Sequence, residues 1–588
     1  MPRTSSSSLI SLLNNEFDSR NRTFISHGTN PSTVTTANGS AHDRYRLFYS
    51  GHLLRLAEVT QTVSPINGYV FHNRLSHSLK VGVTAGLLAK RLKERFKSSS
   101  CPLQMTLANY IDPVVAECAG YAHDIGHPPF GHIAEEELDS LAREYGLSDG
   151  FEGNAQTFRI AARLGGADLF AGSNDDDTLG LDLTRATMAA MVKYPWTWGE
   201  LSQDQREAHT NKSQKQKWGI FDDDIEIFQE IVFPSQISRL TTSTSKRRTL
   251  EAEIMDWADD MTFAVHDLLD FYCSGQIPLF LLVDAAGEYL KKRGVAKWNS
   301  SVEMPPEWRK FVIFLMERPK LRRLLNKAAS KYARWQESAV TSSAQGQQPN
   351  ESSPNKEELV NPEKLLEFHL ASFINIHFKS FTSRYTATPS QRRAIAQATT
   401  LLINTFSEAI SIIDSTTWDE YEDEDPTSFV TIEPLIELTV EILKQFTWHY
   451  VIVGHTLSAD SQGSRFVIKT VAHALMANAE NERRDAYLFP EHMRSRWSPV
   501  ISVRIKTGYQ KIDTENERWV EILEDLLKKE EISTEVFTNI REAVAKQGSK
   551  RPLKSREQRL RDVIDYVASM SEPELMRIFK QLTGHNSY

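Results

Sequence analysis

Cysteine is scarce in this chain of 588 residues, which contains only three, at Cys101, Cys118 and Cys273. They are too few and too scattered for a disulfide framework or a cysteine metal site. No apolar run is long enough to span a membrane, and the first residues lack the basic-then-apolar pattern of a secretory signal. Basic residues are outnumbered, because the formal net charge is −9. The composition therefore predicts a cytoplasmic protein without a membrane segment, and it argues against a general nucleic-acid coat.

Polar, low-complexity stretches divide the rest of the chain. Residues 1–42 are rich in Ser, Thr, Asn and Gly and are expected to form a flexible N-terminal tail. Residues 339–362 are rich in Ser, Gln, Asn and Pro and are expected to form a flexible loop. Between and after them, 43–338 and 363–588 show helical periodicity, with no internal repeat and no alternation of strands and helices. The expected fold class is all-α.

The stretch 118–136, CAGYAHDIGHPPFGHIAEE, concentrates ionisable side chains within an apolar setting. A helix over 121–127 would place His123 and His127 four residues apart on one face. Pro128 and Pro129 cannot continue that helix, so PPFG is expected to form a tight corner. A second helix is expected to start near Gly131 or His132. Several imidazoles and carboxylates would therefore meet around one corner.

Metal binding is the preferred interpretation of the His123-Asp124 pair. A histidine beside an aspartate on a surface helix usually contacts only water. Here the flanking residues are mostly apolar, which indicates burial, and buried ionisable groups need partners. A divalent cation satisfies His and Asp together. Two further ligands are expected elsewhere in the chain.

Two other predicted helices supply candidates for those ligands. In RLSHSLKVGVTAGLLAKRLKERF, His77 lies one turn before the inner residue Val81. In EAEIMDWADDMTFAVHDLLDF, Asp259, Phe263 and Asp267 form one stripe at i, i+4 and i+8. An acid on an apolar helix is costly unless it is neutralised. The alternative, a solvated helix edge, suits Asp260 better.

His77, His123-Asp124 and Asp259, in this order, resemble the H…HD…D pattern of the HD-domain phosphohydrolases. Longer strings resemble one branch of them, the deoxynucleoside triphosphate triphosphohydrolases or dGTPase family: RLSHSLKV, HDIGHPPFGHIAEE, GFEGNAQTFRI, LDLTRATMAAMVKYP and IMDWADDMTFAVHD. These strings run from about residue 44 to 270. The resemblance implies an HD-domain fold with helical additions. In it, 43–338 would be the catalytic core, and 363–588 would complete the core and form oligomer interfaces.

The metal ligands expected from this comparison are His77, His123, Asp124 and Asp259. Two imidazoles and two carboxylates suit a divalent cation, with Mg²⁺ or Mn²⁺ expected. His132 lies beyond the metal helix and is expected to transfer protons rather than bind the metal. Glu135, three residues on, can hydrogen-bond its imidazole and raise its basicity. The resemblance makes His132 the acid that protonates the leaving 5′ oxygen.

The expected substrate contacts are Arg55, Gln61, Arg74, His127, Lys193, Tyr194, Phe263 and Asp267. By resemblance, Arg74 and His127 contact phosphate oxygens, and Lys193 with Tyr194 contacts the triphosphate. Arg55 and Gln61 belong to a segment that helps form the nucleotide pocket, although a solvated surface helix is an equal alternative. Phe263 and Asp267 would bound the deoxyribose. The family usually has Tyr at the position of Phe263, so one hydroxyl is missing here.

The resemblance implies metal-dependent hydrolysis of dNTPs, with dGTP the expected substrate, to a deoxynucleoside and inorganic triphosphate. Another HD-domain nucleotide phosphohydrolase is one alternative. An oligomeric protein that keeps the fold and binds nucleotides or single-stranded nucleic acid is the other. The expected partners are a dNTP and further copies of the chain, as a dimer, tetramer or hexamer. Single-stranded nucleic acid is a further partner allowed by the resemblance, and no membrane is expected.

Overall fold

The computed structural model describes residues 39–62, 72–165, 180–211, 214–229, 248–295, 306–343, 362–420, 428–452, 455–480, 489, 500–505, 508–513, 519–529, 531–538 and 555–584. Within these residues the chain is mainly helical, and strands occur only as two short antiparallel pairs. The all-α fold class predicted from the sequence is confirmed. None of the helices in these ranges is both long and apolar enough to cross a bilayer.

The chain divides into two compact units. The larger unit comprises Met1–Gly131 and Gly153–Gln462, and the smaller unit comprises His132–Glu152 and Gly463–Tyr588. The expected tail 1–42 and loop 339–362 lie largely outside the described residues. Helix α2 nevertheless begins at Gly39 and α15 continues to Ser343, so helical residues extend into both segments. The predicted boundaries at residues 42, 338 and 362 stay predictions.

The larger unit is built almost entirely of helices. Its elements in chain order are α2 (Gly39–Phe48), α3 (Gly51–Arg55), η3 (Leu56–Glu58), α4 (Arg74–Phe96), α5 (Pro102–Tyr110), α6 (Pro113–Ala122), α8 (Gly153–Arg159), η5 (Ile160–Leu164), α9 (Arg185–Ala190), η7 (Trp198–Glu200), α10 (Gln203–Thr210), η8 (Asp222–Asp224), α11 (Ile225–Ile227), α12 (Leu250–Cys273), α13 (Leu279–Val295), α14 (Pro306–Met316), α15 (Pro319–Ser343), α17 (Pro362–Phe378), α18 (Pro389–Glu408), β1 (Ile410–Ile412), α19 (Ser415–Glu420), β2 (Val430–Ile432), α20 (Pro434–Thr447) and η10 (Trp448–Ile452). Strands β1 and β2 pair antiparallel, with Ile410 opposite Ile432.

The smaller unit contains α7 (His132–Glu144), β3 (Val500–Ile505), β4 (Gly508–Asp513), α23 (Trp519–Lys528), α25 (Arg556–Ala568) and α26 (Glu572–Thr583). Helix α21 (His455–Glu480) begins in the larger unit and ends in this one. Strands β3 and β4 form an antiparallel hairpin in which Ile505 faces Gly508. In this unit the buried guanidinium of Arg561 pairs with the carboxylate of Asp149, which ties α25 to the end of the segment that contains α7.

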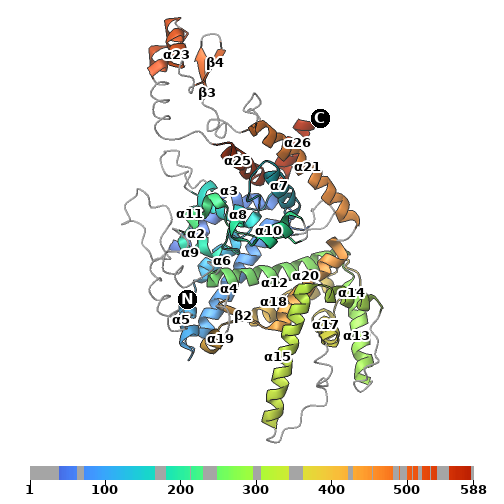
Figure 1. The fold of residues 1–588 in the computed structure, drawn as a ribbon. Helices are drawn as coiled ribbons and strands as arrows, with labels where there is room; N and C mark the ends of the chain where they lie inside the picture. Colours follow the sequence, from blue (N-terminus) through green and yellow to red (C-terminus); the bar gives the residue numbers. More distant parts are fainter. Residues whose placement is uncertain are drawn as a thin grey trace. The chain divides into compact units, whose positions relative to one another are not determined.

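Three helices of the larger unit, α4, α6 and α12, pack together around one apolar core, and Figure 1 shows α12 running beside α4. Helix α4 buries Val81, Ala85 and Leu88 on one stripe, as its periodicity predicts. Glycine permits the close crossing of α4 and α6, because a Cβ added at Gly120 would lie 2.6 Å from the Cα of Gly82. This crossing fixes the end of α6 against the beginning of α4.

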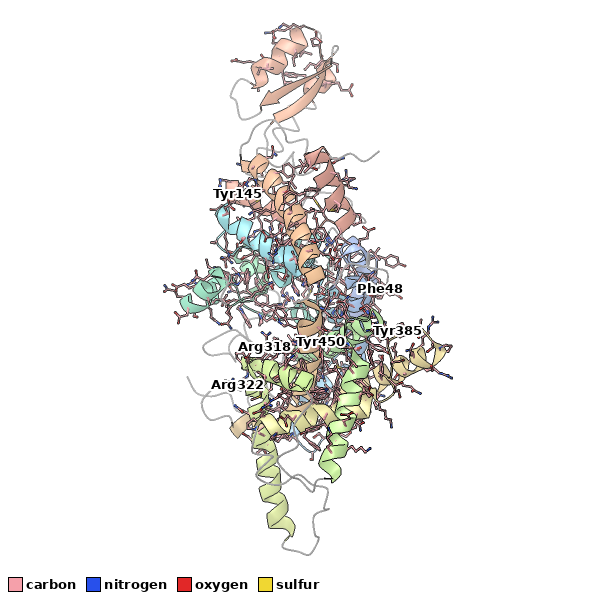
Figure 2. All side chains as sticks on the ribbon, turned by 90° about the vertical axis from the view of Figure 1, so that its right-hand side faces the viewer. Phe48, Tyr145, Arg318, Arg322, Tyr385 and Tyr450 are labelled. Carbon is pink, nitrogen blue, oxygen red and sulfur yellow. The ribbon has the colours of Figure 1, made fainter. Side chains whose placement is uncertain are left out.

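A second packing layer joins α14, α20 and η10 through aromatic rings. The ring of Phe311 lies 4.4 Å from that of Phe446 and 6.2 Å from that of Tyr450, measured between centroids. Arg318 lies over the ring of Phe314 at 4.4 Å, and Figure 2 shows Arg318 in the neighbourhood of Tyr450. Helix α20, which carries Phe446, also packs on α12.

Candidate metal centre

Helix α4 brings Arg74 and His77 into the interior from its first turn. Asn73 caps the helix, because its side-chain oxygen accepts a hydrogen bond from the Ser76 backbone at 2.8 Å. The Arg74 backbone N–H donates to the carbonyl of Val59 at 3.1 Å, which fixes the entry of the chain. Arg74 and His77 are each only 2% exposed. The Asn73 cap and the Val59 carbonyl therefore fix the start of the helix that carries Arg74 and His77.

Helix α6 ends earlier than the sequence predicted. It runs over Pro113–Ala122, and His123 is its C-terminal cap. Beyond it the backbone tightens into turns, with the His127 N–H donating to the carbonyl of Asp124 at 3.0 Å. The prediction of a helix through 127 was therefore wrong. The tighter turn arises because Pro128 and Pro129 remove the N–H donors that a further helical turn would use.

We call residues 123–127 the HD turn. Thr157, which the sequence did not indicate, holds the backbone of this turn through two hydrogen bonds. Its hydroxyl accepts from the Gly126 N–H at 3.0 Å and donates to the His123 carbonyl at 3.2 Å. A Cβ added at Gly126 would lie 2.2 Å from the Thr157 nitrogen, so only glycine fits at that position. In the sequence GFEGNAQTFRI, nothing distinguishes Thr157 from an ordinary helix residue, so this role could not be predicted.

Helix α12 completes the group by presenting Asp259. Ligand atoms of His77, His123 and Asp259 all lie within 4.8 Å of one another. Nε2 of His77 is 2.9 Å and Nε2 of His123 is 3.6 Å from the same oxygen, Oδ1 of Asp259. Oδ1 of Asp124 lies 3.4 Å from His123 Nε2. The structure thus brings together the four residues that the sequence predicted as metal ligands.

One nitrogen, Nε2 of His123, indicates that these four residues fit a cation. His123 Nδ1 is 2.8 Å from the carbonyl of Gly120, so this nitrogen carries the proton. Its Nε2 is then left as an acceptor, and it is buried with no hydrogen-bond partner among the described residues. Burial lowers the pKa of His123, which favours the neutral imidazole that metals bind. A buried lone pair facing two carboxylates is best satisfied by a divalent cation.

Both carboxylates of this group are ionised. Burial alone would raise their pKa values, yet neighbouring basic groups outweigh it and hold the pKa of Asp124 and of Asp259 well below the usual range. For Asp124 these neighbours are His123, His127 and Arg74. For Asp259 the largest is Lys193, whose ammonium group contacts Oδ2. Two permanent negative charges therefore face the two imidazoles.

The guanidinium of Arg74 lies beside the candidate metal ligands. Nη1 donates to Oδ2 of Asp124 at 2.8 Å, whereas Nε and Nη2 are buried without a partner in the described part of the chain. Gly131, at φ 56°, makes room for it, because a Cβ there would lie 2.7 Å from Nη2. Buried guanidinium N–H groups that lack acceptors are suited to phosphate oxygens. This geometry supports the predicted phosphate contact of Arg74.

His127 and Arg55 meet at the HD turn. Nδ1 of His127 lies 3.1 Å from Oδ1 of Asp124. Nη2 of Arg55 donates to the carbonyls of His127 at 2.7 Å and Ile125 at 2.9 Å. Arg55 therefore holds the backbone of the turn, which the sequence did not indicate. Gln61 is half-buried, and the nucleotide contacts of both residues stay predictions.

Lys193 and Tyr194 follow α9 rather than ending it, since that helix stops at Ala190. Burial would lower the pKa of Lys193, but Asp259 and Asp256 outweigh it and raise the pKa. Nζ contacts Asp259 and is 3.6 Å from Oδ1 of Asp256, which also pairs with Arg248. The ring of Tyr194 lies edge-on to that of Trp196. Lys193 thus stands at the rim of the carboxylate group, and its contact with a triphosphate stays a prediction.

The other predicted substrate residues lie along α12. Phe263 is half-buried, and Asp267 is 5% exposed and accepts a hydrogen bond from the hydroxyl of Thr62 at 3.0 Å. Burial raises the pKa of Asp267 to about 7, against the lowering effect of the Thr62 bond. Thr62 was not singled out from the sequence, because its polar neighbours show no periodicity. The sugar contacts of Phe263 and Asp267 stay predictions.

His132 and Glu135 pair in the smaller unit, as their spacing predicted. Helix α7 begins at His132, and Nδ1 of His132 lies 2.6 Å from Oε2 of Glu135. The His132 side chain is 58% exposed, whereas Glu135 is buried. A buried carboxylate that binds Nδ1 leaves Nε2 directed outward for proton transfer. This pair is confirmed as a contact, and its catalytic role stays a prediction.

A family model described as the HD domain matches residues 74–263. The matched range contains the four predicted metal ligands as well as Arg74, His127 and Lys193. It also contains most of the three segments, 74–96, 113–127 and 250–273, that build the centre in the structure.

The chain is also similar to curated proteins named deoxyguanosinetriphosphate triphosphohydrolase-like protein. One from Corynebacterium efficiens is 36% identical over 253 residues, which cover 43% of this chain and 50% of that protein. One from Streptomyces coelicolor is 35% identical over 262 residues, covering 44% and 52% respectively. One from Shewanella woodyi is 33% identical over 270 residues, covering 42% and 56%. The chain spans about half the length of the curated relatives that it matches. The chain therefore contains an HD domain, and over less than half of its length it is similar to the deoxyguanosinetriphosphate triphosphohydrolase-like proteins.

Proposed function

We propose that this protein hydrolyses deoxynucleoside triphosphates in a metal-dependent reaction, with dGTP as the preferred substrate. The observation that carries the proposal is the convergence of His77, His123, Asp124 and Asp259 beside the buried N–H groups of Arg74. A candidate cation site next to guanidinium N–H groups that lack an acceptor among the described residues suits a phosphate ester. The names of the relatives add the substrate class, and they favour dGTP among the dNTPs.

The four ligand residues would hold Mg²⁺ or Mn²⁺, which when bound supplies a Lewis acid and an activated water. Arg74 would donate its Nε and Nη2 hydrogens to phosphate oxygens, with its orientation set by Asp124. Lys193, which carries its charge at neutral pH, would steady the triphosphate. Glu135 would fix the tautomer of His132, so that protonated His132 donates its proton from Nε2 to the 5′ oxygen. These roles follow from residue chemistry and from the family resemblance together.

In the proposed reaction water attacks the α-phosphorus. The new bond joins the water oxygen to this phosphorus, and the bond that breaks joins the phosphorus to the 5′ oxygen. The nucleoside leaves with the proton from His132, and the three phosphates leave as one tripolyphosphate ion. The attacking water gives up one proton to solvent, and His132 regains its proton from solvent. This assignment distinguishes the protein from nucleotidases that release phosphate or pyrophosphate.

The products test the assignment directly. With dGTP and Mn²⁺ we expect deoxyguanosine and tripolyphosphate, separated by ion exchange, without early monophosphate or diphosphate. In ¹⁸O-labelled water the label should enter tripolyphosphate, because the water oxygen becomes bound to the α-phosphorus. A labelled nucleoside, or dGMP with pyrophosphate as first products, would contradict attack at this position. A panel of dNTPs and NTPs run alongside would separate the second candidate, another HD-domain nucleotide phosphohydrolase.

Sugar selection can be tested at Phe263, where the family usually has tyrosine. The half-buried ring can pack on a sugar but offers no hydroxyl. We expect Phe263→Tyr to change dGTP turnover by less than about threefold and to improve discrimination against GTP by about two- to tenfold, the worth of one neutral hydrogen bond. The measurement is kcat/KM for dGTP and for GTP in both proteins. A wild-type protein that hydrolyses GTP as fast as dGTP would overturn the deoxyribose assignment.

A further inference from the structure

Outside the metal centre, His72 makes a set of contacts that neither the sequence nor the family comparison singles out. This residue precedes Asn73, the cap of α4, and lies two residues before Arg74. Both its backbone N–H, at 3.0 Å, and its ring Nδ1, at 2.5 Å, bond to one oxygen, Oδ2 of Asp270 on α12. The carboxylate of Asp270 on α12 thus binds both the main chain and the side chain of His72, just before α4.

Two further side chains contact the imidazole of His72. Its ring stacks on that of His266, also from α12, with centroids 4.5 Å apart and planes 8° from parallel. The ammonium group of Lys80, from the second turn of α4, contacts Nε2. Burial lowers the pKa of His266 to about 2, so the ring beneath His72 is neutral. His72, Asp270, His266 and Lys80 are named the α4 latch below.

The latch gives α4 a second attachment to α12. The first is at the metal centre, where His77 Nε2 meets Asp259 Oδ1 at 2.9 Å. Asp270 lies three turns further along α12, roughly 16 Å at the helical rise per residue. The Asn73 cap and the bond from the Arg74 N–H to the Val59 carbonyl hold the backbone at the start of α4, and the latch adds a polar restraint on the position of this first turn relative to α12. Two separated attachments fix its position and its rotation.

Arg74 is the residue that most needs this support. It lies between the two attachments, buried with Nε and Nη2 unpaired among the described residues. Unpaired buried donors cost free energy that a looser helix start could recover by turning the guanidinium toward water. Something must therefore hold Arg74 in the orientation that suits a phosphate. The Asp124 bond restrains one guanidinium nitrogen, and the main chain must restrain the rest of the side chain.

We infer that the α4 latch, through Asp270 and His72, is a positioning device for Arg74 and, to a smaller degree, for His77. Asp270 and His72 themselves lie outside the set of metal ligands and predicted phosphate contacts. They act by holding the first turn of α4, so that Arg74 is oriented before substrate binds. The inference rests on the proposed function for its kinetic readout but not for its metal-binding readout.

The first test removes the hydrogen bonds between Asp270 and His72. Asp270→Ala removes the one oxygen that accepts both hydrogen bonds from His72. His72→Phe keeps a ring over His266 but loses the ring nitrogens. We expect Asp270→Ala to lower kcat/KM for dGTP by about 10- to 100-fold, the usual effect of misplacing a binding group or a ligand support. The effect of His72→Phe should be smaller, since its backbone N–H remains. Asp270→Asn keeps an acceptor oxygen and should stay within about threefold of wild type.

A double-mutant cycle separates positioning from general stability. If the latch acts through Arg74, Asp270→Ala should cost less than about twofold in an Arg74→Ala background. Glu253→Ala is the matched control, because Glu253 is another α12 carboxylate that accepts backbone N–H groups, those of Phe429 and Val430. It should lower Tm but leave kcat/KM within about twofold of wild type. Two results would overturn the inference: an undiminished effect of Asp270→Ala in the Arg74→Ala background, or a loss of kcat/KM in Glu253→Ala as large as that in Asp270→Ala.

Calorimetric titration with Mn²⁺ and no nucleotide measures the latch without relying on turnover. We expect the Kd of Asp270→Ala to rise by about three- to tenfold through His77, and that of Glu253→Ala and Asp270→Asn to stay near wild type. If the wild type hydrolyses no dNTP but binds Mn²⁺ with this pattern, the proposed function fails and the latch stands. If dNTPs are hydrolysed while Asp270→Ala matches wild type in Kd and kcat/KM, the latch fails alone.

Discussion

Asp124→Ala is expected to abolish metal binding and to lower dGTP turnover by at least about 10³-fold, since a bound cation contributes several kcal/mol of transition-state stabilisation. Asp124 is a carboxylate that contacts three groups of the centre at once. Its oxygens lie 3.4 Å from His123 Nε2, 3.1 Å from His127 Nδ1 and 2.8 Å from Arg74 Nη1. Its loss removes a ligand and the restraint on Arg74 together. The measurements are bound Mn²⁺ after dialysis and kcat.

The same change also leaves a buried guanidinium without its partner, which costs about 3–5 kcal/mol of stability in comparable pairs. Asp124→Asn separates the two effects, because the amide oxygen can still accept from Arg74 but the negative charge is gone. We expect Asp124→Asn to melt close to wild type and still to bind Mn²⁺ poorly. Unchanged metal content together with full activity in either variant would remove Asp124 from the centre.

His132→Ala is expected to lower turnover by about 10²- to 10⁴-fold, the usual worth of a positioned acid or base, and to leave metal binding intact. The reason is the pairing in α7, where the buried Glu135 holds Nδ1 at 2.6 Å and the ring remains largely exposed. Such a ring is arranged to exchange protons at Nε2. The measurements are kcat, the Kd for Mn²⁺ and the Kd for dGTP under non-turnover conditions.

Glu135→Gln provides a graded companion, because the amide oxygen can still accept from Nδ1 but does not raise the basicity of the imidazole. It should shift the basic limb of the pH–rate profile toward lower pH, since a less basic imidazole loses its proton earlier. His473→Ala is the control, an exposed histidine of the same unit, and should behave as wild type. Loss of Mn²⁺ from His132→Ala would mean that this residue binds the metal instead.

The sequence alone was sufficient for the parts of the centre that depend on local rules. The inner stripe of α4 and the long helix with Asp259, Phe263 and Asp267 follow from periodicity of about 3.6 residues. The start of α7, expected near Gly131 or His132, follows from the corner formed by PPFG. The candidate metal ligands were selected because ionisable residues among apolar ones need partners, and because their order resembles the H…HD…D pattern. Their binding of a metal stays a prediction. The end of α6 was predicted wrongly, since the double proline acts on the turn before it as well as on the corner itself.

Contacts between distant segments could not be predicted from local patterns. Thr157 beneath the HD turn, Arg55 on its carbonyls and the latch from Asp270 to His72 join residues 31 to 198 positions apart. A threonine, an arginine and a histidine at these positions have the same local propensities whether they face solvent or hold the site. The sequence by itself determined which helices form, which of their faces are buried and which residues could bind a cation. The tertiary structure alone decided which carboxylate meets which imidazole and what restrains Arg74, because those choices depend on how α4, α6 and α12 cross rather than on the propensity of any segment.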